Sequence, residues 1–535
     1  MRASDLFVRC LENEGVRYVF GLPGEETLDL MDSLSRSDQI TFVTVRHEQA
    51  AAFMADVYGR LSTYPGVCLA TLGPGATNLI TGVADAQLDR APLVAITGQA
   101  ARDRIFKESH QYLDVMALFR PVTKWNARVE IPETLPEIVR KAFRLARLEK
   151  PGATHVEIPE DVAAAEVAGA PMPVRRTTYP VARPESIAQA VELLAGAKRP
   201  VVLAGNGVIR RQAADALTRF VHHLGIPVAT TFMGKGAIDY HDPLSLAAVG
   251  LRATSEAPPT AIGEADLVVA VGYDLVEWAP EHWNPARDKT ILHVDSVAAE
   301  VDLSYLPAAE VVGEVRESLK LLDEAFDGTC PTWDWECFRS SMQLEAEAND
   351  ESFPVCPPRV VHDLRLALAD DDILISDVGV HKLWVATRFP AARPNTVVIA
   401  NGLASMGIAV PGAIAAKLVH PKRKVVAVTG DGGFMMNSQE LETARRIGTP
   451  FVTLVLVDNR YGVIELNQKR RFGRTFGVDF TNPDFVAYAR SFGLPGFFVT
   501  RTTDLLPILR RALDLDEPAV VAVPVDSSRS PAALT

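Results

Sequence analysis

The sequence predicts an α/β protein with three domains, each built around a parallel sheet. Three observations favour this fold: short apolar segments alternate with helical patterns along the chain, two stretches interrupt the alternation, and 535 residues suffice for about three domains of ~100–200 residues. With 48% hydrophobic and 23% charged residues, the composition is that of an ordinary globular protein. A large core is therefore easily formed.

The first domain is expected at residues 1–168. Its apolar segments predict short buried strands, because each is brief and is followed by a glycine-bearing turn or a helical pattern. These strands are expected at 18–20, 40–45, 67–72 and 93–97. From Gly169 to Pro184 apolar residues are few and prolines frequent, which predicts a linker.

The second and third domains are expected at 184–345 and 356–535, with a break near 345–358. Strands are predicted at 201–204, 267–271 and 291–294 in the second domain, and at 373–376, 424–428, 451–457 and 519–524 in the third. A helix is expected at 440–446, because Gly448-Thr449-Pro450 follows as a stop signal. The first and third domains look alike in kind.

One run, 397–419, has about the length of a membrane span. It is interrupted by polar residues, glycines and a proline, so it predicts a buried strand and helix beside a ligand. The interrupting residues are Asn401, Gly402, Gly407, Pro411 and Gly412.

The net charge of −13 and the lack of a long basic block disfavour a nucleic-acid partner. Five scattered cysteines and an N-terminus without an apolar leader indicate a reducing compartment, so we expect a cytoplasmic protein.

The segment Gly430-Asp431-Gly432-Gly433 ends one predicted strand, and Asp458-Asn459 ends the next. Because parallel strands end at the same edge of a sheet, Asp431 and Asp458 are expected to offer two oxygen ligands at one place. The glycines allow backbone N–H groups to approach a diphosphate at a helix start. Magnesium and a diphosphate cofactor are the natural interpretation, with a plain turn as the alternative.

This segment resembles the cofactor-binding motif of thiamine diphosphate enzymes, although Val457-Asp458 stands where the common form has two asparagines. A carboxylate remains a competent magnesium ligand. The resemblance implies a third domain that binds the diphosphate, with the metal held by Asp431, Asp458 and the carbonyl of Arg460. It also places Gly430, Gly432, Gly433 and Tyr461 at the cofactor.

The first domain resembles the pyrimidine-binding domain of the same family. The likeness lies in Phe20-Gly21-Leu22-Pro23-Gly24, in Glu48, and in Gly73-Pro74-Gly75-Ala76-Thr77-Asn78. It implies that Pro23, Gly24 and Asn78 contact the cofactor and that Glu48 bonds to N1′ of its aminopyrimidine. The resulting tautomer removes the C2 proton of the thiazolium, and the carbanion attacks a 2-oxo acid, which loses carbon dioxide. The alternative for Glu48 is an ordinary carboxylate at a helix start.

Two further segments of the third domain carry the likeness. Met406 matches the apolar residue over which the family bends the cofactor, and the carbonyl of Ala404 would meet the 4′-amino group. The segment with Val380 and His381 resembles the one that brings a histidine to the diphosphate. A core methionine and a surface histidine are the alternatives.

The region around His110 and Gln111 resembles the substrate region of acetolactate synthases, which implies hydrogen bonds to the acceptor 2-oxo acid. The alternative is that both residues merely cap a loop.

In the central domain, Gly205-Asn206-Gly207 lacks the third glycine of a dinucleotide site. The segment from Gly272-Tyr273-Asp274 to Glu277-Trp278 instead resembles the catabolic, flavin-free branch, which implies that no FAD is bound.

The resemblance implies an enzyme that joins two pyruvates to 2-acetolactate with loss of carbon dioxide. In this family the site forms between the first domain of one subunit and the third domain of another, so a homodimer or homotetramer is expected. Three alternatives stay open: another thiamine diphosphate-dependent decarboxylase or carboligase, a flavin- or nicotinamide-linked oxidoreductase, and a non-catalytic homologue.

Overall fold

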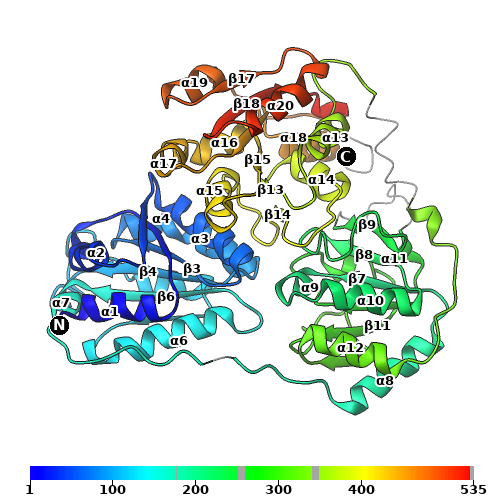
Figure 1. Cartoon of the computed structure of the whole chain (residues 1–535), viewed down its shortest axis with the longest axis horizontal. Coiled ribbons are helices and arrows are strands. Elements are labelled where there is room, and N and C mark those ends of the chain that lie inside the picture. Colours follow the sequence, from blue (N-terminus) through cyan, green and yellow to red (C-terminus); the bar gives the residue numbers. More distant parts are fainter. Residues whose placement is uncertain (176, 251–259, 340–348, 530–535) are drawn as a thin grey trace.

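The structure is a computed structural model that describes residues 1–175, 177–250, 260–339 and 349–529. It contains three six-stranded sheets, and every strand pair in them is parallel (Figure 1). Helices cover both faces of each sheet. The α/β fold with three parallel-sheet domains is therefore confirmed.

The first domain contains the sheet β2-β1-β3-β4-β6-β5. Its helices and strands are α1 Ala3–Asn13, β1 Tyr18–Gly21, α2 Leu28–Ser35, β2 Thr41–Thr44, α3 Glu48–Ser62, β3 Gly66–Ala70, α4 Pro74–Leu88, β4 Leu93–Gln99, α5 Val115–Phe119, β5 Trp125–Arg128, α6 Leu135–Arg147, β6 Ala153–Pro159 and α7 Glu160–Ala164. The four predicted strands form within two residues of their expected ends, whereas β5 and β6 were not predicted.

The central domain contains the sheet β12-β11-β10-β7-β8-β9. Its elements are α8 Pro184–Gly196, β7 Pro200–Ala204, α9 Asn206–Arg210, α10 Ala214–Leu224, β8 Val228–Thr231, β9 Ser245–Val249, α11 Ala261–Glu264, β10 Leu267–Val271, β11 Thr290–Asp295, β12 Ala309–Val312 and α12 Val315–Ala325. Within this domain the chain starts at the middle strand β7 and adds β8 and β9 on one side. It then crosses to the other side and adds β10, β11 and β12, so the topological switch point lies between β7 and β10. The predicted break at 345–358 lies partly outside the described residues.

The third domain contains the sheet β14-β13-β15-β16-β18-β17, which repeats the strand order of the first. Its elements are α13 Pro357–Ala367, β13 Ile373–Ser376, α14 Val380–Arg388, β14 Val397–Ile399, α15 Ala409–Val419, β15 Val425–Gly430, α16 Asp431–Asn437, α17 Glu440–Ile447, β16 Val452–Val457, α18 Gly462–Phe472, α19 Phe485–Ser491, β17 Gly496–Phe498, α20 Leu505–Leu513 and β18 Ala519–Pro524. The predicted likeness of the outer domains is confirmed, and the run 397–419 forms a strand and a helix as expected.

The first and third domains share one continuous core. Helices α3 and α15 pack together between the two sheets (Figure 1), and buried residues of both domains belong to the same apolar cluster. The contact is close because Gly412 has no side chain: a Cβ there would lie 3.0 Å from the Val57 Cγ2 atom. No helix in the described ranges is both long and apolar enough to cross a bilayer.

Candidate functional site

A cavity of about 320 Å³ lies in the third domain, where the strands of its parallel sheet end. Segments that follow β13, β14, β15, β16 and β18 all contribute to its wall. Every site residue that the sequence predicted in this domain lines it. They are Val380, His381, Ala404, Met406, Gly430, Asp431, Gly432, Gly433, Asp458, Arg460 and Tyr461.

Two glycines at the start of α16 allow neighbouring residues to pack closely against this helix start. A Cβ on Gly432 would lie 2.8 Å from the Tyr461 ring, and one on Gly433 would lie 2.9 Å from Asp377 Oδ1. Helix α16 begins directly after β15, whereas the sequence predicted a helix only from residue 440. The cavity therefore faces a glycine-bearing helix start, a place that suits phosphate oxygens.

Asp431 is a buried carboxylate at this helix start, and Asp458 is a half-buried carboxylate near it. Asp431 Oδ2 accepts hydrogen bonds from the Asp458 and Asn459 N–H groups at 3.2 and 2.7 Å and from Asn482 Nδ2 at 2.8 Å. The Ser527 hydroxyl donates to Asp458 Oδ2 at 2.6 Å. Burial raises the pKa of Asp431, and burial with the negative charge of Asp431 raises the pKa of Asp458 to about 6.

This donor set fits a hard divalent cation, which would offset the repulsion between the two carboxylates. Among the described residues, no group of three or more His, Cys, Asp or Glu side chains converges on a metal position. The remaining ligands would therefore be carbonyl, phosphate or water oxygens, as expected for magnesium beside a diphosphate.

His381 lies at the start of α14 and is buried beside Gly379 and Gly430. Its Nε2 atom is buried and has no hydrogen-bond partner within the part of the chain that the structure describes. Burial lowers the pKa of this imidazole to about 4, so the ring is neutral at pH 7. An unpaired polar atom in the cavity wall fits a ligand that carries phosphate oxygens.

The loop with Ala404 and Met406 is held by a residue whose role the sequence did not reveal. The Asp377 carboxylate accepts hydrogen bonds from Gly407 N at 2.8 Å and from Ala409 N at 3.1 Å. Ala404 adopts a left-handed conformation with φ of 57°, which is unfavourable for a residue with a Cβ. Such strain is typical of backbone that must present a group to a ligand.

A second polar cluster lies in the first domain. Glu48 is the first residue of α3 and is 8% exposed, and Asn78 Nδ2 donates to its Oε2 at 2.9 Å. Gly24, in the segment with Pro23, packs against Thr71, which follows β3. The backbone of Gln111 lies next to Gly73, whereas the side chains of His110 and Gln111 are exposed to solvent.

Glu440 fixes the start of α3, a role that no sequence motif indicated. Its Oε1 accepts hydrogen bonds from the N–H groups of Arg46 at 3.0 Å and His47 at 3.1 Å. Thr443 Oγ1 also donates to Glu440 Oε2, at 2.6 Å. A residue of the third domain therefore sets the backbone that carries Glu48.

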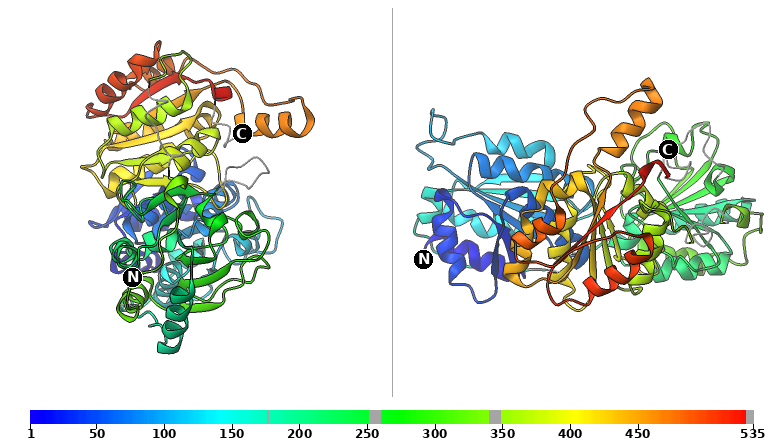
Figure 2. Two further views of the ribbon diagram at one scale, coloured as in Figure 1. Left: turned by 90° about the vertical axis from the view of Figure 1, so that its right-hand side faces the viewer. Right: turned by 90° about the horizontal axis from the view of Figure 1, so that it is seen from above.

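In the described part of the chain, the two clusters are not brought together in the third-domain cavity. None of the predicted first-domain residues lines the third-domain cavity. Helix α18 projects from the body of the molecule beside this cavity (Figure 2), and Glu465 is its one buried side chain. Tyr461 and Ile464 in the cavity wall are exposed apolar residues, and Phe472 at the end of α18 is exposed as well.

Three family models match the chain. They describe the N-terminal, central and C-terminal domains of thiamine pyrophosphate enzymes, at residues 1–118, 187–322 and 377–523. The chain is 36% identical to the acetolactate synthase of Bacillus subtilis (strain 168), over 98% of this chain and 94% of that protein. It is also 36% identical to the catabolic acetolactate synthase of Raoultella terrigena, over 99% and 96%.

A probable acetolactate synthase large subunit from Methanococcus aeolicus is 34% identical, over 99% of this chain and 92% of that protein. These likenesses extend over all three domains, including both polar clusters. The chain therefore belongs to the thiamine pyrophosphate enzymes, in the acetolactate synthase family.

Proposed function

We propose that this protein is an acetolactate synthase, which condenses two pyruvates to 2-acetolactate and carbon dioxide. The observation that carries the proposal is the third-domain cavity, where paired carboxylates, a glycine-bearing helix start and an unpaired buried histidine nitrogen meet. Thiamine diphosphate, when bound, supplies the ring that adds to a 2-oxo acid and accepts the electrons released with carbon dioxide.

The site residues would have different roles: some bind the metal and the diphosphate, and others exchange a proton or position the cofactor. Asp431, Asp458 and the carbonyl of Arg460 would hold Mg²⁺, while His381 and the glycines would bind the diphosphate. Glu48 would exchange a proton with the aminopyrimidine nitrogen, and Asn78 holds the Glu48 carboxylate in place for this role. Val380, Ala404, Met406 and Tyr461 would position the cofactor, Pro23 and Gly24 would contact its pyrimidine, and His110 and Gln111 would face the acceptor.

We infer that Glu48 of one subunit serves the cavity of another. The separation of the two clusters within a chain supports this inference, as do the apolar residues exposed around the cavity. A homodimer is the smallest assembly that would complete the site, and a homotetramer would contain two such pairs. A cytoplasmic location remains a prediction.

A flavin or nicotinamide site in the central domain is the competing proposal, and the switch point disfavours it. A Cβ on Gly205 would lie 2.5 Å from the Gly272 carbonyl oxygen, so these glycines serve close packing of the two turns. The buried Glu277 carboxylate accepts hydrogen bonds from Asn206 N at 3.1 and 3.0 Å. The chain's own carboxylate thus takes the place at the start of α9 that suits a dinucleotide phosphate.

The proposal is tested by pyruvate turnover of the purified protein with Mg²⁺, with and without thiamine diphosphate and without added flavin. Acetolactate and acetaldehyde are measured separately. Acetolactate that requires thiamine diphosphate supports the proposal. Acetaldehyde alone indicates a decarboxylase, and a requirement for flavin would restore the competing proposal.

A further inference from the structure

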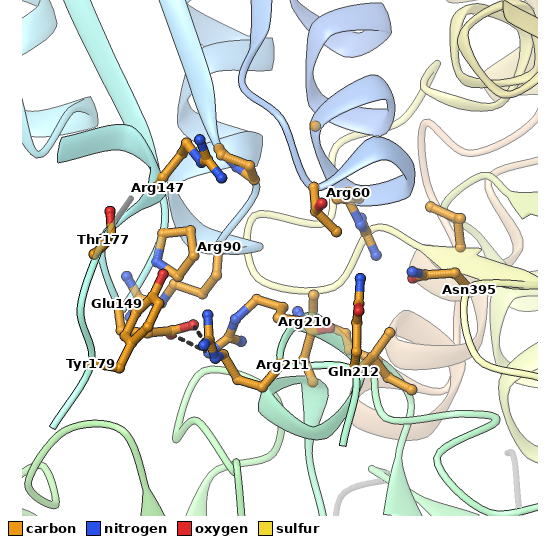
Figure 3. Close-up of a pocket in the computed structure, with 18 of the residues that line it drawn as sticks. Arg60, Arg90, Arg147, Glu149, Thr177, Tyr179, Arg210, Arg211, Gln212 and Asn395 are labelled. Carbon is orange, nitrogen blue, oxygen red and sulfur yellow. Dashed lines mark hydrogen bonds and ion pairs between the residues drawn. The ribbon is translucent and has the colours of Figure 1, made fainter. Parts of the chain in front are cut away.

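A second pocket lies where the three domains meet, and it shares no lining residue with the third-domain cavity. Its volume is about 410 Å³. The ends of α3 and α6, the linker, the segment after β7 and the start of β14 all contribute to it (Figure 3). The size is that of a small-molecule site, which is typically ~300–1,000 Å³.

The ionisable side chains that line this pocket are mostly basic. Seven basic side chains, six of them arginines, line it, and Glu149 is the one carboxylate among its lining residues in the described ranges. Figure 3 shows several guanidinium groups arranged around the same space. The seven basic residues are Arg60, Arg90, Arg147, Arg175, Arg210, Arg211 and Lys235.

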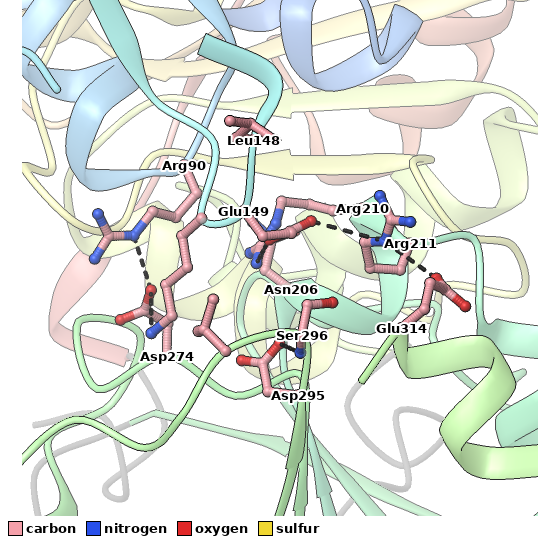
Figure 4. Close-up of polar contacts among 12 residues, drawn as sticks. Arg90, Leu148, Glu149, Asn206, Arg210, Arg211, Asp274, Asp295, Ser296 and Glu314 are labelled. Atoms are coloured by element: carbon pink, nitrogen blue, oxygen red, sulfur yellow. Dashed lines mark hydrogen bonds and ion pairs between the residues drawn. The ribbon is translucent and has the colours of Figure 1, made fainter. Parts of the chain in front are cut away.

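Neighbouring carboxylates balance only part of this charge (Figure 4). Glu149 is shared between Arg210 at 3.1 Å and Arg211 at 3.8 Å, and Arg211 also pairs with Glu314 at 3.1 Å. Arg60 pairs with Asp89 at 3.0 Å. Asp274 pairs with Arg90 at 2.8 Å, but it also serves Lys150 at 3.3 Å.

Three basic side chains have no carboxylate within ion-pair distance in the part of the chain that the structure describes: Arg147, Arg175 and Lys235. Burial lowers the pKa of Lys235 to about 7, so this amine is only partly charged at pH 7 and the two arginines carry most of the unpaired charge. Arg147 stacks over the Tyr64 ring at 5.0 Å, and Lys235 donates to the Ala386 carbonyl oxygen at 2.9 Å. Asp295 and Glu277 also act on Arg210, and burial raises the pKa of both carboxyl groups. The pKa of Glu277 is raised to about 7, so this carboxyl group carries only part of a negative charge at pH 7.

Arg210 itself is poorly satisfied. Its Nη2 donates to Glu149, whereas the buried Nε and Nη1 have no acceptor among the described residues. A buried guanidinium with unpaired donors adds to the positive potential of the pocket.

We propose that the three-domain pocket binds a small organic phosphate. Several cations converge on it from different elements, so a dianion with three oxygens fits better than a carboxylate with two oxygens and one charge. Val174, Ile209, Met233, Val397 and Val398 supply an apolar wall for the carbon body of the ligand. Because all three domains line the pocket, the bound phosphate stabilises their arrangement.

The test is a calorimetric titration of phenyl phosphate into the enzyme saturated with thiamine diphosphate and Mg²⁺, so that the other phosphate site is filled. Saturable binding and a higher melting temperature are expected, with weaker binding of benzoate. The double variant Arg147→Ala/Arg175→Ala should bind phenyl phosphate roughly 10- to 100-fold more weakly, because it loses two charge-assisted contacts.

The control Arg9→Ala/Arg501→Ala removes two exposed arginines elsewhere and should leave the affinity unchanged. Circular dichroism shows whether each variant is folded, and Arg147→Lys/Arg175→Lys, which keeps the charge, should recover part of the affinity. The proposal fails if the wild type shows no saturable binding, if the alanine variant binds as well as the control, or if benzoate binds as tightly as phenyl phosphate. These measurements do not depend on pyruvate turnover.

Discussion

Glu48 combines a position at a helix start with a side-chain partner, Asn78, that fixes its carboxylate. We expect Glu48→Gln to lower kcat for pyruvate by about 10²–10⁴-fold, because an amide cannot exchange the proton. Thiamine diphosphate should still bind, since the diphosphate and metal residues lie in the other domain. Pyruvate consumption and a cofactor titration check this, with the exposed Glu137→Gln as the control. Wild-type turnover by Glu48→Gln would remove Glu48 from the mechanism.

The buried carboxyl group of Glu440 should make the free energy of unfolding depend on pH. Burial raises its pKa from 4.5 to about 7. The folded protein therefore keeps a proton that the unfolded chain releases, so the contribution of Glu440 to the free energy of unfolding is full below pH 4.5 and falls as pH rises through 7.

Between pH 5 and 7.5, wild type should lose about 1–3 kcal/mol of this free energy relative to Glu440→Gln, which has no such titration. Urea denaturation at both pH values measures the difference. Glu137→Gln, at an exposed position of α6, serves as the control. Parallel pH profiles for wild type and Glu440→Gln would contradict the burial argument.

At the level of elements, the start of α16 is tested by adding one methyl group. Gly432→Ala should push the Tyr461 ring out of its position, because the new Cβ would lie 2.8 Å from it. Tyr461 is partly exposed and can move, so we expect stability to change by less than about 1 kcal/mol. The affinity for thiamine diphosphate with Mg²⁺ should fall by roughly 10-fold or more.

Gly196→Ala is the matched control, because no atom lies within 4 Å of a Cβ built there. Fluorescence titration with the cofactor compares both variants with wild type. Equal affinity in Gly432→Ala would mean that the cofactor does not approach this helix start.

The elements differ in how well the sequence predicted them. Central strands such as β10 and β13 are fully buried apolar runs, so their composition alone revealed them. The edge strand β5 is half-exposed along its length and β17 has only three residues, so neither carries a clear pattern. Helix α16 begins Asp-Gly-Gly, and two glycines disfavour a helix that here depends on its tertiary contacts.

The residues of the candidate site also differ in how well they could be predicted from the sequence. The family resemblance predicted the wall of the third-domain cavity, because its motifs follow strands that end at one edge of the sheet. The supporting roles of Asp377 and Glu440 could not be predicted. Each acts on backbone that is distant in sequence, so its partner is visible only in the folded chain.

At the level of the whole molecule, the proposed shared site predicts complementation between two inactive chains. Glu48→Gln damages the first-domain cluster and Asp431→Ala damages the third-domain cavity. In a mixed dimer, one site would receive both defects and the other would be intact. Co-expression with two different tags should therefore restore about a quarter of wild-type activity when half of the dimers are mixed.

The tagged mixed dimer, purified through both tags, should reach about half of wild-type activity per dimer, with one intact site of two. Co-expression of Glu48→Gln with a second Glu48→Gln chain is the control and should stay inactive. A mixed dimer without activity would place the site within a single chain.

The joint packing of α3 and α15 also constrains how the chain is made. Roughly 350 residues separate the end of α3 from the start of α15. At about 5–20 residues per second, a ribosome needs roughly 20–70 s to cover this distance. During that time α3 has emerged without its partner, and its apolar face stays uncovered. The first domain to be synthesised is thus among the last to complete its core, so we expect the nascent chain to expose apolar surface that a chaperone can bind.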